Sequence, residues 1–178
     1  MEMMTTGRID LTVEAYYQKI QRKTACLIAA CSKGGAIVSH ASDEEIELLH
    51  TYGMNLGIAF QIIDDILDYT QDQPTIGKPA GNDLRQGMVT LPLIYALQSS
   101  SVNGHQRQVQ TLLNGQEKDE QDILDVLNWV THSDSIELAL ADAHTYAAKA
   151  REALHHFPNS SNRDDLDNLI DFVLERTH

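Results

Sequence analysis

The chain has 178 residues, of which 42% are hydrophobic and 6% aromatic, and this length fits one domain, residues 1–178, with a sizeable core. Its formal net charge of -13 argues against nucleic acid and anionic membrane surfaces as partners. No apolar run approaches about 18 residues and no signal peptide is recognisable, so we expect no membrane span and a cytoplasmic location. Cys26 and Cys31 are interpreted as small core residues kept reduced in that compartment.

Almost every segment has the helical period and no alternating strand is evident, so the predicted fold class is all-α. A first helix is expected over 12–39, and a second from the capping box of Ser42 and Glu45 to about Tyr69. Further helices are expected from Thr90 onward and over 106–113, 120–131, 136–157 and 164–176, with loops over 71–82 and 99–104. Gly53 and Gly57 cost stability inside the second helix, which indicates close packing or substrate access there.

The most informative segment of the chain places three carboxylates within an apolar helix. Gln61, Asp64, Asp65 and Asp68 are spaced so that they share one helix face, opposite a run of isoleucines and leucine. A solvated acidic stripe is the ordinary interpretation of such a pattern. Here the preceding residues 56–60 are apolar almost all round, so we expect the acidic face to point into a cleft. Crowded carboxylates need a cation, and oxygen ligands suit Mg²⁺, so the pattern favours a magnesium site.

Two lysines are candidates for binding an anion, although each is weak evidence alone. Lys78 lies in a Gly- and Pro-rich loop after the acidic helix and could reach a phosphate held by the metal. Gly-Lys loops are common, however, and mostly solvated. Lys23 lies where a polar helix surface gives way to an apolar run, and taken singly it is interpreted as a surface lysine whose stem packs on the helix.

Three motifs occur in a specific order along the chain: Lys23-Thr24, Phe60-Gln61-x-x-Asp64-Asp65-x-x-Asp68, and Gly77-Lys78-x-x-Gly81-x-Asp83. This order resembles the trans-isoprenyl diphosphate synthases. The runs FQIIDDILDYT and GKPAGNDLRQGMVTLPLIYAL look like the bacterial medium- and long-chain branch of that family. The resemblance covers nearly the whole chain and is weaker after Ser99.

The resemblance implies an isoprenoid-synthase-type helical bundle around a deep cavity, with the N-terminal helices of the family absent from this chain. Members join isopentenyl diphosphate to an allylic prenyl diphosphate, head to tail and with Mg²⁺ as cofactor. The allylic C–O bond ionises, the alkene attacks the cation, and a proton is lost. Such a site must stabilise a leaving diphosphate while it excludes water.

The resemblance also assigns roles by position. Asp64 would be the main Mg²⁺ ligand, Asp65 and Asp68 would assist it, and Asp83 would hold the water shell of the metal. The expected catalytic residues are Lys23, Lys78 and Asp64. The expected binding residues for the allylic diphosphate are Lys23, Thr24, Phe60, Gln61 and Lys78.

One departure from the family pattern limits the expected activity. The family carries two aspartate-rich motifs, and this sequence contains only the one that resembles the second. Each group that stabilises an oxyanion is typically worth about 3 kcal/mol, so the chain alone is expected to be inactive. An apolar face left bare would need a homodimer or a partner chain to cover it. The alternatives are a non-catalytic helical subunit that binds a prenyl synthase and a helical protein with a solvated acidic patch.

Overall fold

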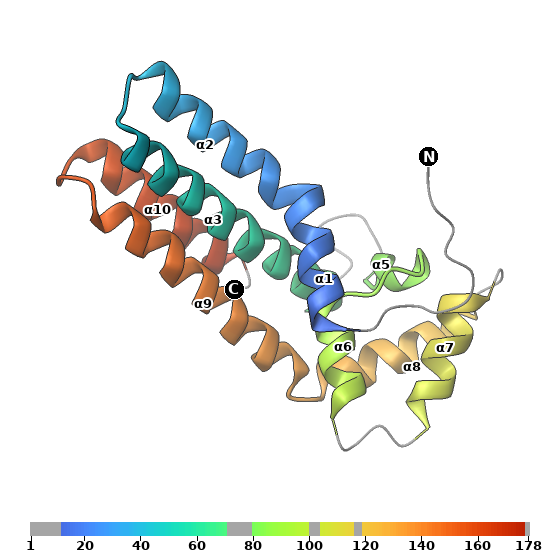
Figure 1. The fold of residues 1–178 in the computed structure, drawn as a ribbon. Coiled ribbons are helices and arrows are strands. Elements are labelled where there is room, and N and C mark those ends of the chain that lie inside the picture. Colours follow the sequence, from blue (N-terminus) through green and yellow to red (C-terminus); the bar gives the residue numbers. More distant parts are fainter. Residues whose placement is uncertain (1–11, 71–79, 100–103, 116–118, 177–178) are drawn as a thin grey trace, which may run out of the picture.

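The structure, a computed structural model, describes residues 12–70, 80–99, 104–115 and 119–176, and within these ranges every regular element is a helix. In chain order the elements are α1 (Val13–Ile20), the π-helical turn η1 (Gln21–Ala25), α2 (Cys26–Val38), α3 (Asp43–Thr70), α5 (Asn82–Arg85), α6 (Leu91–Gln98), α7 (His105–Asn114), α8 (Glu120–Thr131), α9 (Ser135–His155) and α10 (Ser161–Glu175). The long helices α2, α3, α9 and α10 lie side by side, and α7 and α8 lie beyond one end of them (Figure 1). The predicted all-α fold is confirmed.

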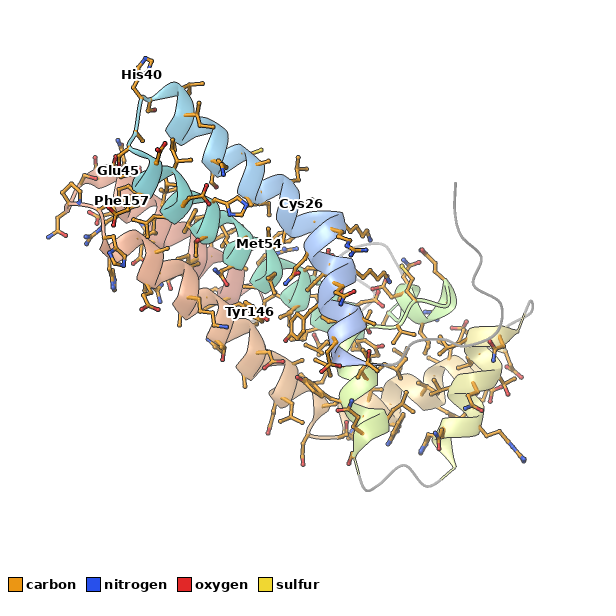
Figure 2. All side chains as sticks on the ribbon, in the orientation of Figure 1. Cys26, His40, Glu45, Met54, Tyr146 and Phe157 are labelled. Carbon is orange, nitrogen blue, oxygen red and sulfur yellow. The ribbon has the colours of Figure 1, made fainter. Side chains whose placement is uncertain are left out.

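The first predicted helix is continuous but contains a π turn, η1, that was not predicted. Its buried residues Tyr16, Ile20, Ala25 and Ala29 are spaced four, five and four apart, and the step of five falls within η1. A π turn holds one residue more than an α turn, which accounts for this spacing. The rod formed by α1, η1 and α2 ends at Val38, and the turn that follows has His40 at its tip with a positive φ of 56° (Figure 2).

Helix α3 begins at the predicted capping box. The Ser42 backbone N–H donates to Glu45 Oε2 at 2.8 Å, and the Glu45 N–H donates back to Ser42 Oγ at 3.3 Å. Close packing on α2 explains both glycines of α3. A Cβ on Gly53 would lie 2.8 Å from Ala29 Cα, and one on Gly57 would lie 2.6 Å from Ala25 Cα.

A second hydrophobic cluster, formed by α5 to α8 and the end of α3, extends the core beyond the long helices. The short helix α5 was not predicted. Its N-cap is Gly81, whose φ of +74° favours glycine and where an added Cβ would meet the Leu127 side chain at 2.7 Å. Thr90 precedes α6 as predicted, but its hydroxyl hydrogen-bonds Tyr69 Oη at 2.9 Å and does not cap the helix. Helix α8 has the predicted bounds of 120–131.

Helix α2 carries an exposed apolar face. Leu27 is 66% exposed and Val38 77% exposed. Cys26 and Cys31 are also exposed, so their interpretation as core residues is wrong. The reason is that α2 packs mainly on α3, which covers only one of its sides. Among the helices of the described ranges, none is both long and apolar enough to cross a membrane.

Candidate functional site

The C-terminal half of α3, the rod of α1 and η1, and the segment from α5 to the start of α6 together line a pocket of about 110 Å³. The pocket collects residues from all three sequence motifs: Lys23, Gln61, Asp64, Asp65 and Asp83. Two of its further lining residues, Tyr16 and Lys19, were not singled out from the sequence. The spacing of 16, 19 and 23 along one helix was a signal that could have found them.

A chain of hydrogen bonds joins η1 and α1 to the acidic helix. The Thr24 hydroxyl donates to Gln61 Oε1, and Gln61 Nε2 donates to Asp65 Oδ1, each at 2.8 Å. The Tyr16 hydroxyl donates to Asp65 Oδ2 at 2.8 Å. Both oxygens of Asp65 therefore have protein donors, and the residue is 4% exposed. These three hydrogen bonds fix the Gln61 amide and the Asp65 carboxylate relative to the helix that carries Lys23.

The electrostatics of the pocket are those of crowded, partly desolvated acids. Burial raises the pKa of Asp65 to about 7, although the hydrogen bonds from Tyr16 and Gln61 act in the opposite direction. Burial also raises the pKa of Asp83, and the charges of Asp68 and Asp64 raise it further. A bound cation would relieve both the repulsion and the desolvation, because it favours the ionised carboxylates.

Asp68 is turned away from this pocket. Its two carboxylate oxygens accept the backbone N–H groups of Asn82 and Asp83, each at 3.0 Å. The Asp68 carbonyl accepts the Gly81 N–H at 2.7 Å. These bonds hold the start of α5 against the end of α3, and in this way Asp68 positions Asp83 at the pocket. Its expected role as an assisting metal ligand stays a prediction.

The donor set fits a magnesium ion in its chemistry, although it is not a preformed cage. Within the part of the chain that the structure describes, no group of three or more His, Cys, Asp or Glu side chains is placed to hold a metal ion. The pocket nevertheless offers oxygen donors only, from Asp64, Asp65, Asp83 and Gln61. Mg²⁺ suits this arrangement, since it commonly keeps several waters and binds one or two carboxylates together with a phosphate.

Of the predicted binding residues that the structure describes, Phe60 and Thr24 do not line this pocket. Thr24 is joined to it by its bond to Gln61, whereas the ring of Phe60 lies beneath the guanidinium of Arg176, which is 4.9 Å from the ring centroid. Lys78 falls outside the described residues. Beside the acidic pocket lies a second, less polar one of about 310 Å³, which is lined in part by Met88, Val89 and Ile94.

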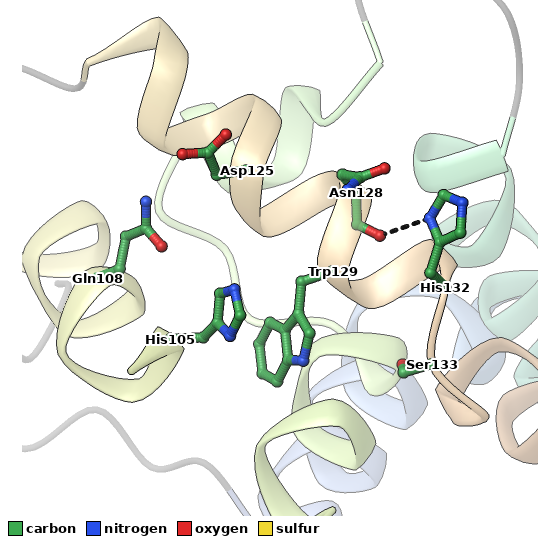
Figure 3. A pocket seen from close by; sticks show the side chains of 7 residues that line it. All are labelled: His105, Gln108, Asp125, Asn128, Trp129, His132 and Ser133. Atoms are coloured by element: carbon green, nitrogen blue, oxygen red, sulfur yellow. Dashed lines mark hydrogen bonds between the residues drawn. The ribbon is translucent and has the colours of Figure 1, made fainter. Parts of the chain in front are cut away.

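A third cavity, of about 470 Å³, lies between α7 and α8 and shares no lining residue with the acidic pocket (Figure 3). The rings of His105 and Trp129 stack there with their centroids 4.5 Å apart. His132 hydrogen-bonds the Asn128 carbonyl through Nδ1 at 2.8 Å. Of the described residues that were predicted to bind metal or diphosphate, none lines this cavity.

Comparison with known proteins assigns the chain to a family. Residues 1–130 match the family model described as polyprenyl synthetase. The short chain isoprenyl diphosphate synthase of Methanothermobacter thermautotrophicus is 38% identical over 178 residues, which are 100% of this chain and 54% of that protein. Heptaprenyl diphosphate synthase component 2 of Bacillus subtilis is 34% identical over 94% of this chain and 47% of its own length.

Solved structures agree with this assignment. The polyprenyl synthase of Caulobacter crescentus, in complex with calcium and isoprenyl diphosphate, superposes with a TM-score of 0.89 at 36% identity, over 98% of this chain and 53% of that one. The chain thus spans about half the length of these relatives. The family match covers most of the sequence, and the structural likeness covers nearly all of it. The chain belongs to the polyprenyl synthetase family.

Proposed function

We propose that this chain forms the allylic-diphosphate side of a Mg²⁺-dependent prenyl transfer site. The observation that carries the proposal is the pocket in which Lys23 meets three carboxylates and the Gln61 amide. Acidic ligands and a basic residue in one pocket are what a metal-bound diphosphate requires. The complex of the Caulobacter relative with calcium and isoprenyl diphosphate supports the same ligand class.

In this proposal each side chain has a defined task. Asp64, which is more exposed than Asp65 and Asp68, and Asp83 would hold Mg²⁺ directly or through water. The bonds from Thr24 and Tyr16 fix Gln61 and Asp65 at the floor of the site. When bound, the ion would supply Lewis-acid stabilisation of the charge on a leaving diphosphate.

The remaining tasks concern the two ends of the substrate. Lys23, together with Lys78, would neutralise the allylic diphosphate. The less polar pocket beside Tyr16 has room for part of the prenyl chain. The condensation itself, with isopentenyl diphosphate as the second substrate, belongs to this proposal as well.

Binding of pyrophosphate tests the proposed site without a need for turnover. Calorimetric titration of pyrophosphate in the presence of Mg²⁺ should give saturable binding to the wild-type chain. Asp64→Asn should weaken it by about tenfold or more, because a charge-assisted contact is lost. Asp165→Asn removes the same charge from an exposed position of α10 and is the matched control. Equal binding by the wild type and Asp64→Asn would exclude Asp64 as a ligand.

A second candidate function is a non-catalytic subunit of a two-component synthase. Two observations favour it: Asp65 and Asp68 are both occupied by protein donors, and one relative is named component 2 of a heptaprenyl diphosphate synthase. The two candidates differ in a condensation assay with labelled isopentenyl diphosphate. The chain is assayed alone and with the remaining half of the Methanothermobacter enzyme as a separate chain. If product forms in the mixture and Asp64→Asn abolishes it, the chain contributes to catalysis.

We also propose that a second copy of this chain covers the exposed face of α2. The charged residue of α2, Lys33, is paired with Glu47 of α3, and small exposed residues such as Ala30 and Gly35 allow a second helix to approach closely. Sedimentation velocity over a range of concentrations should show a dimer that Leu27→Asp converts to a monomer. Leu138→Asp, at an exposed leucine of α9, is the control and should leave the dimer intact. A wild-type chain that stays monomeric throughout would contradict the proposal.

Finally, we propose a cytoplasmic location for the chain, because the free and exposed Cys26 and Cys31 would stay reduced in that compartment.

A further inference from the structure

Arg176, which ends α10, reaches across to the acidic helix α3. Its Nη2 lies 3.5 Å from Asp64 Oδ1, and its guanidinium carbon lies 4.9 Å from the centroid of the Phe60 ring. Phe60 and Asp64 are four residues apart, so the ring and the carboxylate are neighbours on one face of α3. A planar guanidinium can stack on the first and pair with the second at the same time.

The position of Arg176 is set by the way α10 packs. Twelve residues earlier on α3, the Tyr52 hydroxyl donates to the Leu166 carbonyl of α10 at 3.0 Å. The two contacts run in the same order along both helices, so α10 lies parallel to α3 and delivers its last turn to the acidic residues (Figure 1). Arg176 therefore reaches Asp64 from a helix that the core holds in place, since Ile170 and Val173 are buried.

Two features of the Arg176 contact indicate that it is built to be exchanged. The separation of 3.5 Å lies at the long limit for a hydrogen bond, and Asp64 is 51% exposed, so the ion pair is weak. The second terminal nitrogen, Nη1, is buried and has no hydrogen-bond partner among the described residues. A buried guanidinium N–H without an acceptor is costly, and an anion at this position would satisfy it.

We propose that Arg176 is an exchangeable counter-cation of the site: it pairs with Asp64 while no metal is bound and turns its guanidinium to the diphosphate once a divalent cation occupies Asp64. The proposal rests on the proposed function and adds a residue outside the three sequence motifs. Arg176 competes with the metal for one carboxylate and then supports the anion that the metal brings. Its effects on the binding of metal and of anion are therefore opposite in sign.

The test compares Arg176→Gln with the wild type by calorimetry. Mg²⁺ alone should bind Arg176→Gln about two- to fivefold more tightly, because the weak competing ion pair is gone. Pyrophosphate in saturating Mg²⁺ should bind about tenfold or more weakly, because a charged donor is lost. Arg107→Gln, at an exposed arginine of α7, is the control for the change in net charge and should alter neither affinity. Unchanged affinities in Arg176→Gln, or a loss of both, would overturn the proposal.

Arg176→Lys separates charge from shape. It keeps the positive charge, so the affinity for Mg²⁺ should stay near that of the wild type. It loses the planar donors, so the affinity for pyrophosphate should still fall.

A double-mutant cycle of Asp64→Asn and Arg176→Gln in urea unfolding distinguishes failure of this inference from failure of the proposed function. The cycle needs no ligand. The shifts of the urea midpoint in the two single variants should not add up to the shift in the double variant at low salt, and they should do so at high salt. If the wild type binds neither Mg²⁺ nor pyrophosphate while the cycle shows coupling, the proposed function fails and the ion pair stands. Additive shifts at low salt would remove the ion pair itself.

Discussion

Asp65→Asn should stabilise the folded chain at pH 8, because the Asp65 carboxylate is ionised at that pH and its burial as a charged group lowers the free energy of unfolding. Its pKa is raised from 3.8 to about 7 by burial. Between these two values the folded chain binds more protons at this site than the unfolded chain does. Stability therefore falls as the pH rises through that window. A shift of this size corresponds to a penalty of about 4 kcal/mol at pH 8 and about 2 kcal/mol at pH 5.

An asparagine can replace Asp65 without leaving a polar atom unpaired. Its side-chain oxygen can accept the Tyr16 hydroxyl as the carboxylate does at 2.8 Å. Its amide nitrogen can donate to Gln61 if the Gln61 amide turns over, and Thr24 then accepts from Gln61 in place of donating to it. The substitution thus removes the buried charge and keeps the chain of hydrogen bonds. The free energy of unfolding should therefore rise by most of this penalty.

Urea unfolding followed by circular dichroism, in buffer without divalent ions, measures the effect. The gain in the free energy of unfolding should approach about 4 kcal/mol at pH 8 and shrink to about 2 kcal/mol at pH 5. Asp165→Asn, at an exposed site, should change stability by less than about 0.5 kcal/mol at both values. A gain in Asp65→Asn that is the same at pH 5 and pH 8 would refute the reasoning, because it would show that Asp65 does not titrate in this range.

Three further predictions concern the packing and the charge of the same region. Tyr16→Phe should destabilise the chain by about 1–3 kcal/mol, and more at pH 8 than at pH 5, because the lost hydrogen bond favours the ionised form of Asp65. Equal losses of stability at the two pH values in urea titrations would contradict this. Gly57→Ala should lower the free energy of unfolding by at least about 2 kcal/mol, since its Cβ would lie 2.6 Å from the Ala25 backbone. Gly35→Ala has open space around the added Cβ and should raise the free energy of unfolding by up to about 1 kcal/mol. Mg²⁺ should raise the melting temperature at pH 8 and EDTA should reverse this, an effect that Asp64→Asn should reduce; no shift in the wild type would count against a metal site.

Local signals in the sequence sufficed for much of the fold. The capping box of Ser42 and Glu45 is formed as predicted, because its hydrogen bonds join residues three apart. The bounds of α8 follow from its own periodicity. The step of five between the apolar residues Ile20 and Ala25 was also a sign of the π turn, but in the sequence it is easily taken for part of an ordinary α-helix. Cys26 and Cys31 were misplaced because an apolar composition does not say how many neighbours a helix has.

The site was predictable in its members and less so in its geometry. The motifs named Lys23, Gln61 and Asp64, and the fold brings them to one pocket. The turning of Asp68 toward α5 was not foreseeable, because it depends on the backbone N–H groups of Asn82 and Asp83, which lie well beyond the end of α3 in the sequence. The contact of Arg176 with Asp64 joins residues 112 positions apart, and no local pattern indicates such a pairing.

The extra residue in η1 decides what one helix can present to its neighbour. In a regular α-helix, two side chains eight positions apart diverge by about 80° around the axis. Tyr16 and Thr24 are eight apart, yet their hydroxyls bind the linked pair of Asp65 and Gln61. The wider winding of η1 cancels the divergence and brings both hydroxyls to the same side. Deleting one residue from this turn would leave a regular α-helix in which the hydroxyls of Tyr16 and Thr24 no longer both reach Asp65 and Gln61.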